Sequence, residues 1–166
     1  MLGDLPSEKL SPENQDVLDD LLVAIEASER RLGIFIAVCD DMRRREQVVA
    51  CYEQALSPQF RHYRLMLSNN ALSLTALLRQ QVQQESYLQQ GKRAVISVLG
   101  AECLRSLNPN GNRSEQAIFL GYLQWTREAL QAFPFPIVLW ITYDLQKQLI
   151  LKAPDFWSWR REVMRF

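Results

Sequence analysis

Five consecutive apolar residues at positions 137–141 (IVLWI) place the strongest limit on the fold of this chain. A strand without alternating polar residues is typical of a parallel sheet covered by helices on both faces. Pro134 and Pro136 precede the run and Thr142 follows it. The prolines end the preceding helix and extend the chain into the strand. This segment therefore predicts a central, buried strand.

Further apolar runs alternate with helical patterns along the chain. Residues 34–39 (IFIAVC) and 93–99 (RAVISVL) predict buried strands, whereas 63–67 (YRLML) alternates with polar residues, as expected at a sheet edge. Helices are predicted from Ser11-Pro12 onward and over about 42–56, 71–89, 114–132 and 145–151. Helices and strands in alternation predict a three-layer α/β fold with a mainly parallel sheet.

Composition predicts one domain at residues 11–166, preceded by a flexible polar leader at 1–10. The leader lacks a basic and an apolar region, and no apolar run approaches ~18 residues, so we expect a cytoplasmic protein that does not enter a membrane. Nineteen basic and nineteen acidic side chains balance, which argues against nucleic-acid binding.

The three cysteines, Cys39, Cys51 and Cys103, are far apart and lack the spacing of a zinc site. An odd number of scattered cysteines also indicates no disulfide framework. We expect small buried hydrophobic side chains in a reducing compartment.

Ligands in parallel sheets bind at the carboxyl ends of the strands. Four places qualify: Asp40 and Asp41 after the first strand, Asn69 after the second, 100–102 after the third, and 142–144 after the fourth. Candidate binding residues are expected there.

The first of these places lacks a phosphate-binding loop. The sequence C-D-D-M-R-R-R-E occupies the position of a G-x-x-x-x-G-K-[ST] loop, and no glycine occurs between Ile34 and Phe60. Two carboxylates stand where phosphates would have to bind, which argues against nucleotide hydrolysis. We expect Asp40 or Asp41 to cap the second helix, with a metal or base role as the alternative.

The other polar candidates have both structural and functional interpretations. Glu102 stands near the acidic position that organises magnesium in hydrolases of this architecture, but a local cap or salt bridge is the preferred interpretation. Arg160 is expected to stack on an aromatic ring or pair with a carboxylate. Arginines 43–45 predict a solvated helix face. His62 has no triad partner nearby, and the tryptophans and tyrosines between 122 and 159 are expected in the core.

Several longer motifs resemble a known family. RLGIFIAVCDD, AVISVLGAE, SEQAIFLGYLQWTREAL, PFPIVLWIT and above all APDFWSWRREVMRF are similar to the amino-terminal ATPase-like domain of bacterial STAND-related proteins, which normally precedes tetratricopeptide repeats. The resemblance covers about 12–166. It implies a P-loop NTPase-like (Rossmann-like) sandwich with about five parallel strands, the fifth at 163–166, and a role in signalling or complex assembly. This sequence departs from the family in having no phosphate loop, and it ends at Phe166, just where the repeats would begin.

These observations favour a non-catalytic regulatory or protein-interaction module with an unidentified protein partner. The alternative is a nucleotide-binding protein or enzyme whose unorthodox site combines Asp40, Asp41, Glu102 and Arg160. No residue is assigned a catalytic or metal-binding role, no cofactor is expected, and enzymatic activity is not favoured. Self-association through the aromatic carboxyl-terminal segment stays open.

Overall fold

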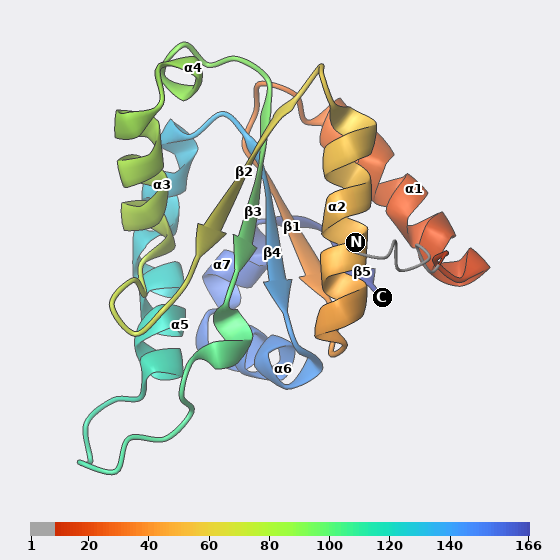
Figure 1. The fold of residues 1–166 in the computed structure, drawn as a ribbon. Helices are drawn as coiled ribbons and strands as arrows, with labels where there is room; N and C mark the ends of the chain where they lie inside the picture. The colour runs from red at the N-terminus through yellow and green to blue at the C-terminus, as the bar shows by residue number, and fades with distance from the viewer. Residues whose placement is uncertain (1–8) are drawn as a thin grey trace, which may run out of the picture.

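The computed structural model describes residues 9–166, so the predicted leader lies outside the described residues apart from Lys9 and Leu10. Five parallel strands form one sheet in the order β2-β3-β4-β1-β5 (Figure 1). The strands are β1 (Gly33–Val38), β2 (Arg61–Met66), β3 (Ala94–Leu99), β4 (Pro136–Ile141) and β5 (Arg160–Arg165). The predicted α/β fold is confirmed, and the sheet is parallel throughout.

Helices cover both faces of the sheet. The helices are α1 (Pro12–Ala27), α2 (Met42–Leu56), α3 (Leu74–Gln84), α4 (Ser86–Gln89), α5 (Glu115–Thr126), α6 (Tyr143–Lys152) and α7 (Pro154–Ser158), with 3-10 turns η1 (Ala101–Cys103) and η2 (Arg127–Ala132). The connection from β1 to β2 crosses the sheet in the opposite direction to the other three. Because such crossovers are right-handed, α2 lies with α1 on one face and the later helices lie on the other (Figure 1).

The core is divided by the sheet into two apolar layers. Every residue of β1, β3 and β4 is buried, which confirms the expectation drawn from their continuous apolar runs. Phe35 and Trp140 face the α1/α2 layer, whereas Ile34 and Ile137 face the layer formed with α5 and α6. The edge strand β2 exposes most of its residues, as its polar alternation predicts.

Several helices begin where their capping residues predict. The Ser11 hydroxyl accepts a hydrogen bond from the Asn14 N–H at the start of α1, and Pro12 occupies the first turn. The Ser114 hydroxyl caps α5 in the same way, through the Ala117 N–H at 3.1 Å. Local sequence therefore fixes the points at which these helices enter the layers.

Two predicted helices are interrupted. The helix expected over 71–89 begins after the Ser73 cap and is broken at Glu85, whose extended backbone turns the chain so that Leu88 reaches the core. The helix expected over 114–132 changes to a 3-10 turn after Thr126, whose hydroxyl donates to the Tyr122 carbonyl at 2.5 Å. A side chain bonded to the preceding turn in this way tends to bend a helix.

The carboxyl-terminal strand is longer than the predicted span of 163–166. β5 begins at Arg160 and pairs with β1 from Ile34 onward, and Phe166 lies beyond it. Its first residues are polar because they lie on an exposed edge, so they lack the apolar signal of a central strand. In the preceding segment, Phe156 is buried, while Trp157 and Trp159 are half-buried against the core.

The cysteine prediction is correct for one residue. Cys39 is buried, Cys51 is half-buried and Cys103 is exposed. Cys103 ends the short turn η1, which projects it toward solvent, so its predicted burial is wrong.

Candidate functional site

A topological switch point lies at the carboxyl ends of β1 and β4. These neighbouring strands pair up to Val38 and Ile141, and their connections then leave toward opposite faces of the sheet. Such a topological switch point is where parallel α/β sheets commonly bind ligands. The residues on its rim are therefore the first candidates for a site.

Asp41 caps α2 at this switch point. Its Oδ1 accepts hydrogen bonds from the backbone N–H groups of Arg43 and Arg44 at 3.0 and 3.2 Å. The start of a helix carries partial positive charge and free N–H groups, which is why phosphates bind there. The prediction that one of the two aspartates caps this helix is confirmed, and the Asp41 carboxylate binds the N–H groups at the start of the helix.

Asp40 performs the corresponding role at α6, the helix that follows β4. Its Oδ1 accepts a hydrogen bond from the Tyr143 backbone N–H at 2.9 Å, while the Thr142 hydroxyl accepts one from Leu145 at 3.2 Å. The loop after β1 is thereby tied to the helix after β4. The two helices that start at the switch point, α2 and α6, each have one of the chain's own carboxylates at their amino end.

Cys39 lies directly beside these carboxylates. Its thiol contacts the Asp41 backbone oxygen at 3.1 Å. Burial raises the pKa of the Cys39 thiol above its ordinary value, although the contact with Asp41 acts in the opposite direction. The thiol therefore stays protonated at neutral pH and is a poor nucleophile.

Glu102 contributes to a buried ion pair. Its carboxylate lies 2.5 Å from Nη1 of Arg45, and the two side chains are 18% and 10% exposed. Burial lowers the pKa of the Arg45 guanidinium, but the hydrogen bonds and charges of Glu102 and Glu46 together outweigh it, so this pKa lies above its ordinary value. The predicted solvated face is wrong for Arg45, because this arginine points into the protein. The predicted local pairing of Glu102 is also wrong, because Arg45 is remote in sequence.

Arg160 lies at the other end of the sheet. It is paired with Ile34 at the amino end of β1, whereas Asp40 follows the carboxyl end of the same strand. Given the rise per residue of a β-strand, Ile34 and Asp40 are about 20 Å apart. Its guanidinium lies 4.2 Å from the Trp157 ring centroid, and Nη1 donates to the Trp157 carbonyl at 2.8 Å. The predicted aromatic stacking is confirmed. The four candidate residues are therefore not gathered into one site.

The Arg45 ion pair belongs to a longer chain of charges along α2 and β2. Arg45 also contacts Glu46 at 3.1 Å, and Glu46 contacts Arg64 at 3.1 Å. Arg64 and His62 both contact the buried Glu53, at 2.7 and 3.1 Å. Opposite charges thus alternate from the sheet edge to the end of β3. Each arginine and glutamate of this chain of charges has an opposite charge beside it, which is typical of a structural network.

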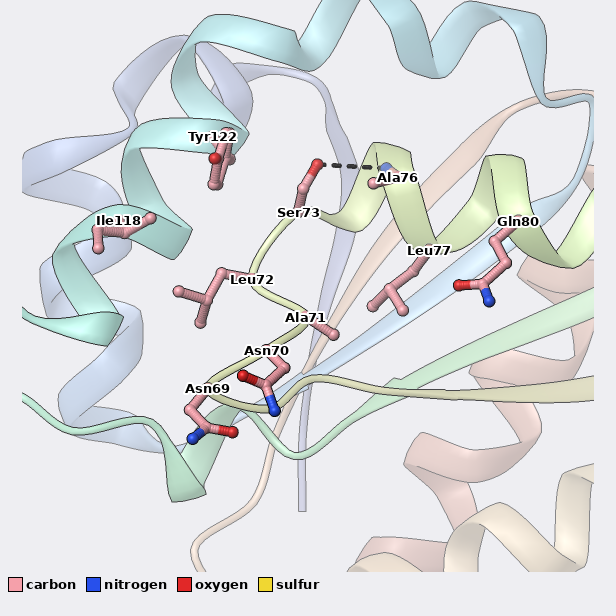
Figure 2. Close-up of a pocket in the computed structure, with 10 residues that line it drawn as sticks. All are labelled: Asn69, Asn70, Ala71, Leu72, Ser73, Ala76, Leu77, Gln80, Ile118 and Tyr122. Atoms are coloured by element: carbon pink, nitrogen blue, oxygen red, sulfur yellow. Dashed lines mark hydrogen bonds between the residues drawn. The ribbon is translucent and has the colours of Figure 1, made fainter.

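A separate pocket of about 440 Å³ lies beyond the carboxyl end of β2 (Figure 2). The β2–α3 connection, the first turns of α3 and the outer face of α5 form its walls. The residues that line it are all uncharged: Asn69, Asn70, Ala71, Leu72, Ser73, Ala76, Leu77, Gln80, Ile118 and Tyr122. Within residues 9–166, the side-chain amides of Asn69, Asn70 and Gln80 make no hydrogen bond. The prediction of candidate residues after β2 named only Asn69.

An exposed aromatic stripe adjoins this pocket. Ile118, Tyr122 and Trp125 follow one another at i, i+4 and i+7 on α5, so they share a face. Tyr122 is 43% exposed and Trp125 is 82% exposed. The predicted core position is therefore wrong for Trp125 and Tyr122, and it is also wrong for Tyr143 at the start of α6, which is 40% exposed. Its helical spacing with Ile118 and Tyr122 was the signal that could have identified this surface.

Comparisons with known proteins do not assign the chain to a family. No protein-family model matches the sequence, and no curated protein shows significant similarity to it. Within residues 9–166, no three His, Cys, Asp or Glu side chains gather closely enough to hold a metal ion. The same part of the chain has no helix long and apolar enough to cross a membrane.

Proposed function

We propose that this chain is a non-catalytic regulatory or protein-interaction module, built on a degenerate P-loop ATPase-like scaffold and acting in signalling or complex assembly. The observation that carries the proposal is the capping of α2 by Asp41, through the N–H groups of Arg43 and Arg44. The N-terminus that would hold a phosphate is already occupied by a carboxylate. The resemblance to STAND-related ATPase-like domains supplies the expected cellular role.

Electrostatics supports the absence of nucleotide chemistry. A phosphate placed at α2 would lie close to the carboxylates of Asp41 and Asp40. Two like unit charges 4 Å apart repel by about 4 kcal/mol at an effective dielectric constant of 20. A normal phosphate loop offsets such costs with glycine N–H groups and a lysine, neither of which this loop contains.

The exposed stripe on α5 supports an interaction role. Contiguous apolar side chains rimmed by polar residues mark interaction surfaces more often than isolated ones. Tyr122 and Trp125 form such a group beside a pocket with free amides. The alternative, a nucleotide-binding protein or enzyme, has less support, because Asp40, Asp41 and Glu102 are engaged and Arg160 lies far from them.

The experiment is a phosphate-release assay with ATP and Mg²⁺, run beside a thermal-shift screen of ATP, ADP and GTP. We expect no turnover above a mock-purified control and no shift of the unfolding midpoint. A bound nucleotide at a hundredfold excess over its dissociation constant would stabilise the protein by about 2.7 kcal/mol. ATP turnover that disappears in the variant Asp41→Ala would refute the proposal.

A further inference from the structure

We propose that the pocket between α3 and α5 binds an uncharged, extended segment of a partner polypeptide, which places one large apolar side chain in the pocket. This inference rests on the proposed interaction function and deepens it by naming the surface and the chemistry of the partner. The pocket residues and Trp125 together are called the α5 groove below. The argument has three parts: the composition of α5, the charge of the groove and its free hydrogen-bonding groups.

Helix α5 is apolar on both faces. Phe119, Leu120 and Leu123 are buried against the sheet, while Ile118, Tyr122 and Trp125 form the outer stripe. Glu115 is its sole charged residue. A helix that is hydrophobic all round is usually buried all round. Within the described part of the chain, Ile118 is half-buried while Tyr122 and Trp125 stay exposed, so the outer face is suited to contact with another molecule.

The charge of the groove selects among partners. Charged residues make up 23% of the chain, yet none of the ten residues that line the pocket is charged. A charged side chain placed against Leu77, Ile118 and Tyr122 would lose hydration without gaining an opposite charge. An uncharged segment has no such cost, so the groove complements a neutral sequence.

The free amides suit a polypeptide backbone. The side-chain amides of Asn69, Asn70 and Gln80 each offer both donors and acceptors, and Figure 2 shows them around the pocket beside the apolar side chains of Leu72 and Leu77. An extended backbone presents N–H and C=O groups at regular spacing while alternate side chains point to one side. The amides can therefore satisfy the backbone while an apolar side chain enters the pocket.

The size of the pocket is consistent with this arrangement. Its volume of about 440 Å³ falls within the range of about 300–1,000 Å³ found for ligand sites. Trp125 extends the apolar surface one turn along α5 beyond Tyr122. Exposed tryptophan and tyrosine side chains are the residues that most often dominate binding energy at interfaces.

The test is selection from a displayed library of random 12-residue peptides on the full chain, followed by affinity measurement with synthetic peptides. The variant Ala76→Phe fills the pocket from an exposed position on α3, and Trp125→Ala removes the exposed ring. Ala50→Phe makes the same change at an exposed position on α2, across the sheet, and is the matched control. All three changes are at exposed positions, so thermal midpoints should confirm that each variant folds.

We expect enriched peptides that lack charged residues around an aromatic or aliphatic anchor. Their affinity should fall at least tenfold in Ala76→Phe and Trp125→Ala and stay unchanged in Ala50→Phe. Amide NMR shifts should concentrate at 69–80 and 118–125. Failure to enrich any peptide, enrichment of charged peptides, or binding that survives Ala76→Phe would overturn the inference. A dimer that dissociates in Ala76→Phe would also overturn it, because a second copy would then cover the groove. ATP turnover, measured in a separate assay, would refute the proposed function.

Discussion

The ion pair between Arg45 and Glu102 leads to a quantitative prediction for the stability of the protein. Its side chains are 10% and 18% exposed and 2.5 Å apart. Removing one partner of a buried pair costs about 3–5 kcal/mol, because the other charge is left uncompensated. We expect about 2–4 kcal/mol for Arg45→Met, since Glu102 is not fully buried. We expect about 1–2 kcal/mol for Glu102→Gln, because Glu46 still contacts Arg45.

The double variant should lose less stability than the sum of the two single variants, with a coupling of about 2 kcal/mol. The assay is urea unfolding followed by far-UV circular dichroism at 25 °C. The matched control is the pair Arg93–Glu29, which has the same separation of 2.5 Å but side chains that are both 43% exposed.

The coupling of the control pair should be below about 1 kcal/mol and should weaken in 0.5 M NaCl. The coupling of Arg45 with Glu102 should persist at that salt concentration. If the losses for Arg45 and Glu102 add within about 0.5 kcal/mol, the buried pair has no special role and this reasoning is wrong.

Three further predictions can be measured by the same unfolding assay. Burial raises the pKa of Tyr52 to about 12, above the ordinary value of 10.0. The unfolded chain therefore loses this proton first, and the free energy of unfolding should fall by about 2–3 kcal/mol between pH 10 and pH 12. The variant Tyr52→Phe should not show this contribution to the alkaline loss of stability. Gly100→Ala should cost at least about 2 kcal/mol, because φ is +91° and the added Cβ would lie 2.5 Å from the Leu67 carbonyl oxygen. Asp40→Ala should cost about 1 kcal/mol, because the Tyr143 N–H loses its cap. An unchanged alkaline profile in Tyr52→Phe, or unfolding midpoints that match the wild type in the other two variants, would contradict these expectations.

Sequence patterns predict the central strands because these strands are buried on both faces. The apolar runs at 34–39, 93–99 and 137–141 coincide with β1, β3 and β4 to within one residue at each end. The fifth strand shows no such run because its Arg160–Arg165 segment lies at an edge, where Met164 is its one buried residue. The other edge strand, β2, was predicted because its apolar and polar residues alternate, a signal that the start of β5 lacks.

The features of the candidate site also differ in whether local sequence could predict them. The Asp41 cap is local, so a carboxylate followed by a helical pattern was enough to predict it. The Arg45–Glu102 pair depends on how α2 is rotated against the end of β3, which no local pattern specifies. On α5, the sequence contains two apolar stripes, and only the packing reveals that the one with Trp125 faces outward.

The strand order has a consequence for synthesis on the ribosome. Although β1 is made first, it pairs only with β4 and β5. Its nearest partner, β4, follows about 100 residues later along the chain, which takes about 5–20 s at a translation rate of 5–20 residues per second. During that interval the apolar residues of β1 lack the neighbours that bury them in the finished sheet. A nascent chain stalled before Pro136 therefore exposes a segment prone to aggregation, and chaperone demand should be greatest shortly before β4 emerges.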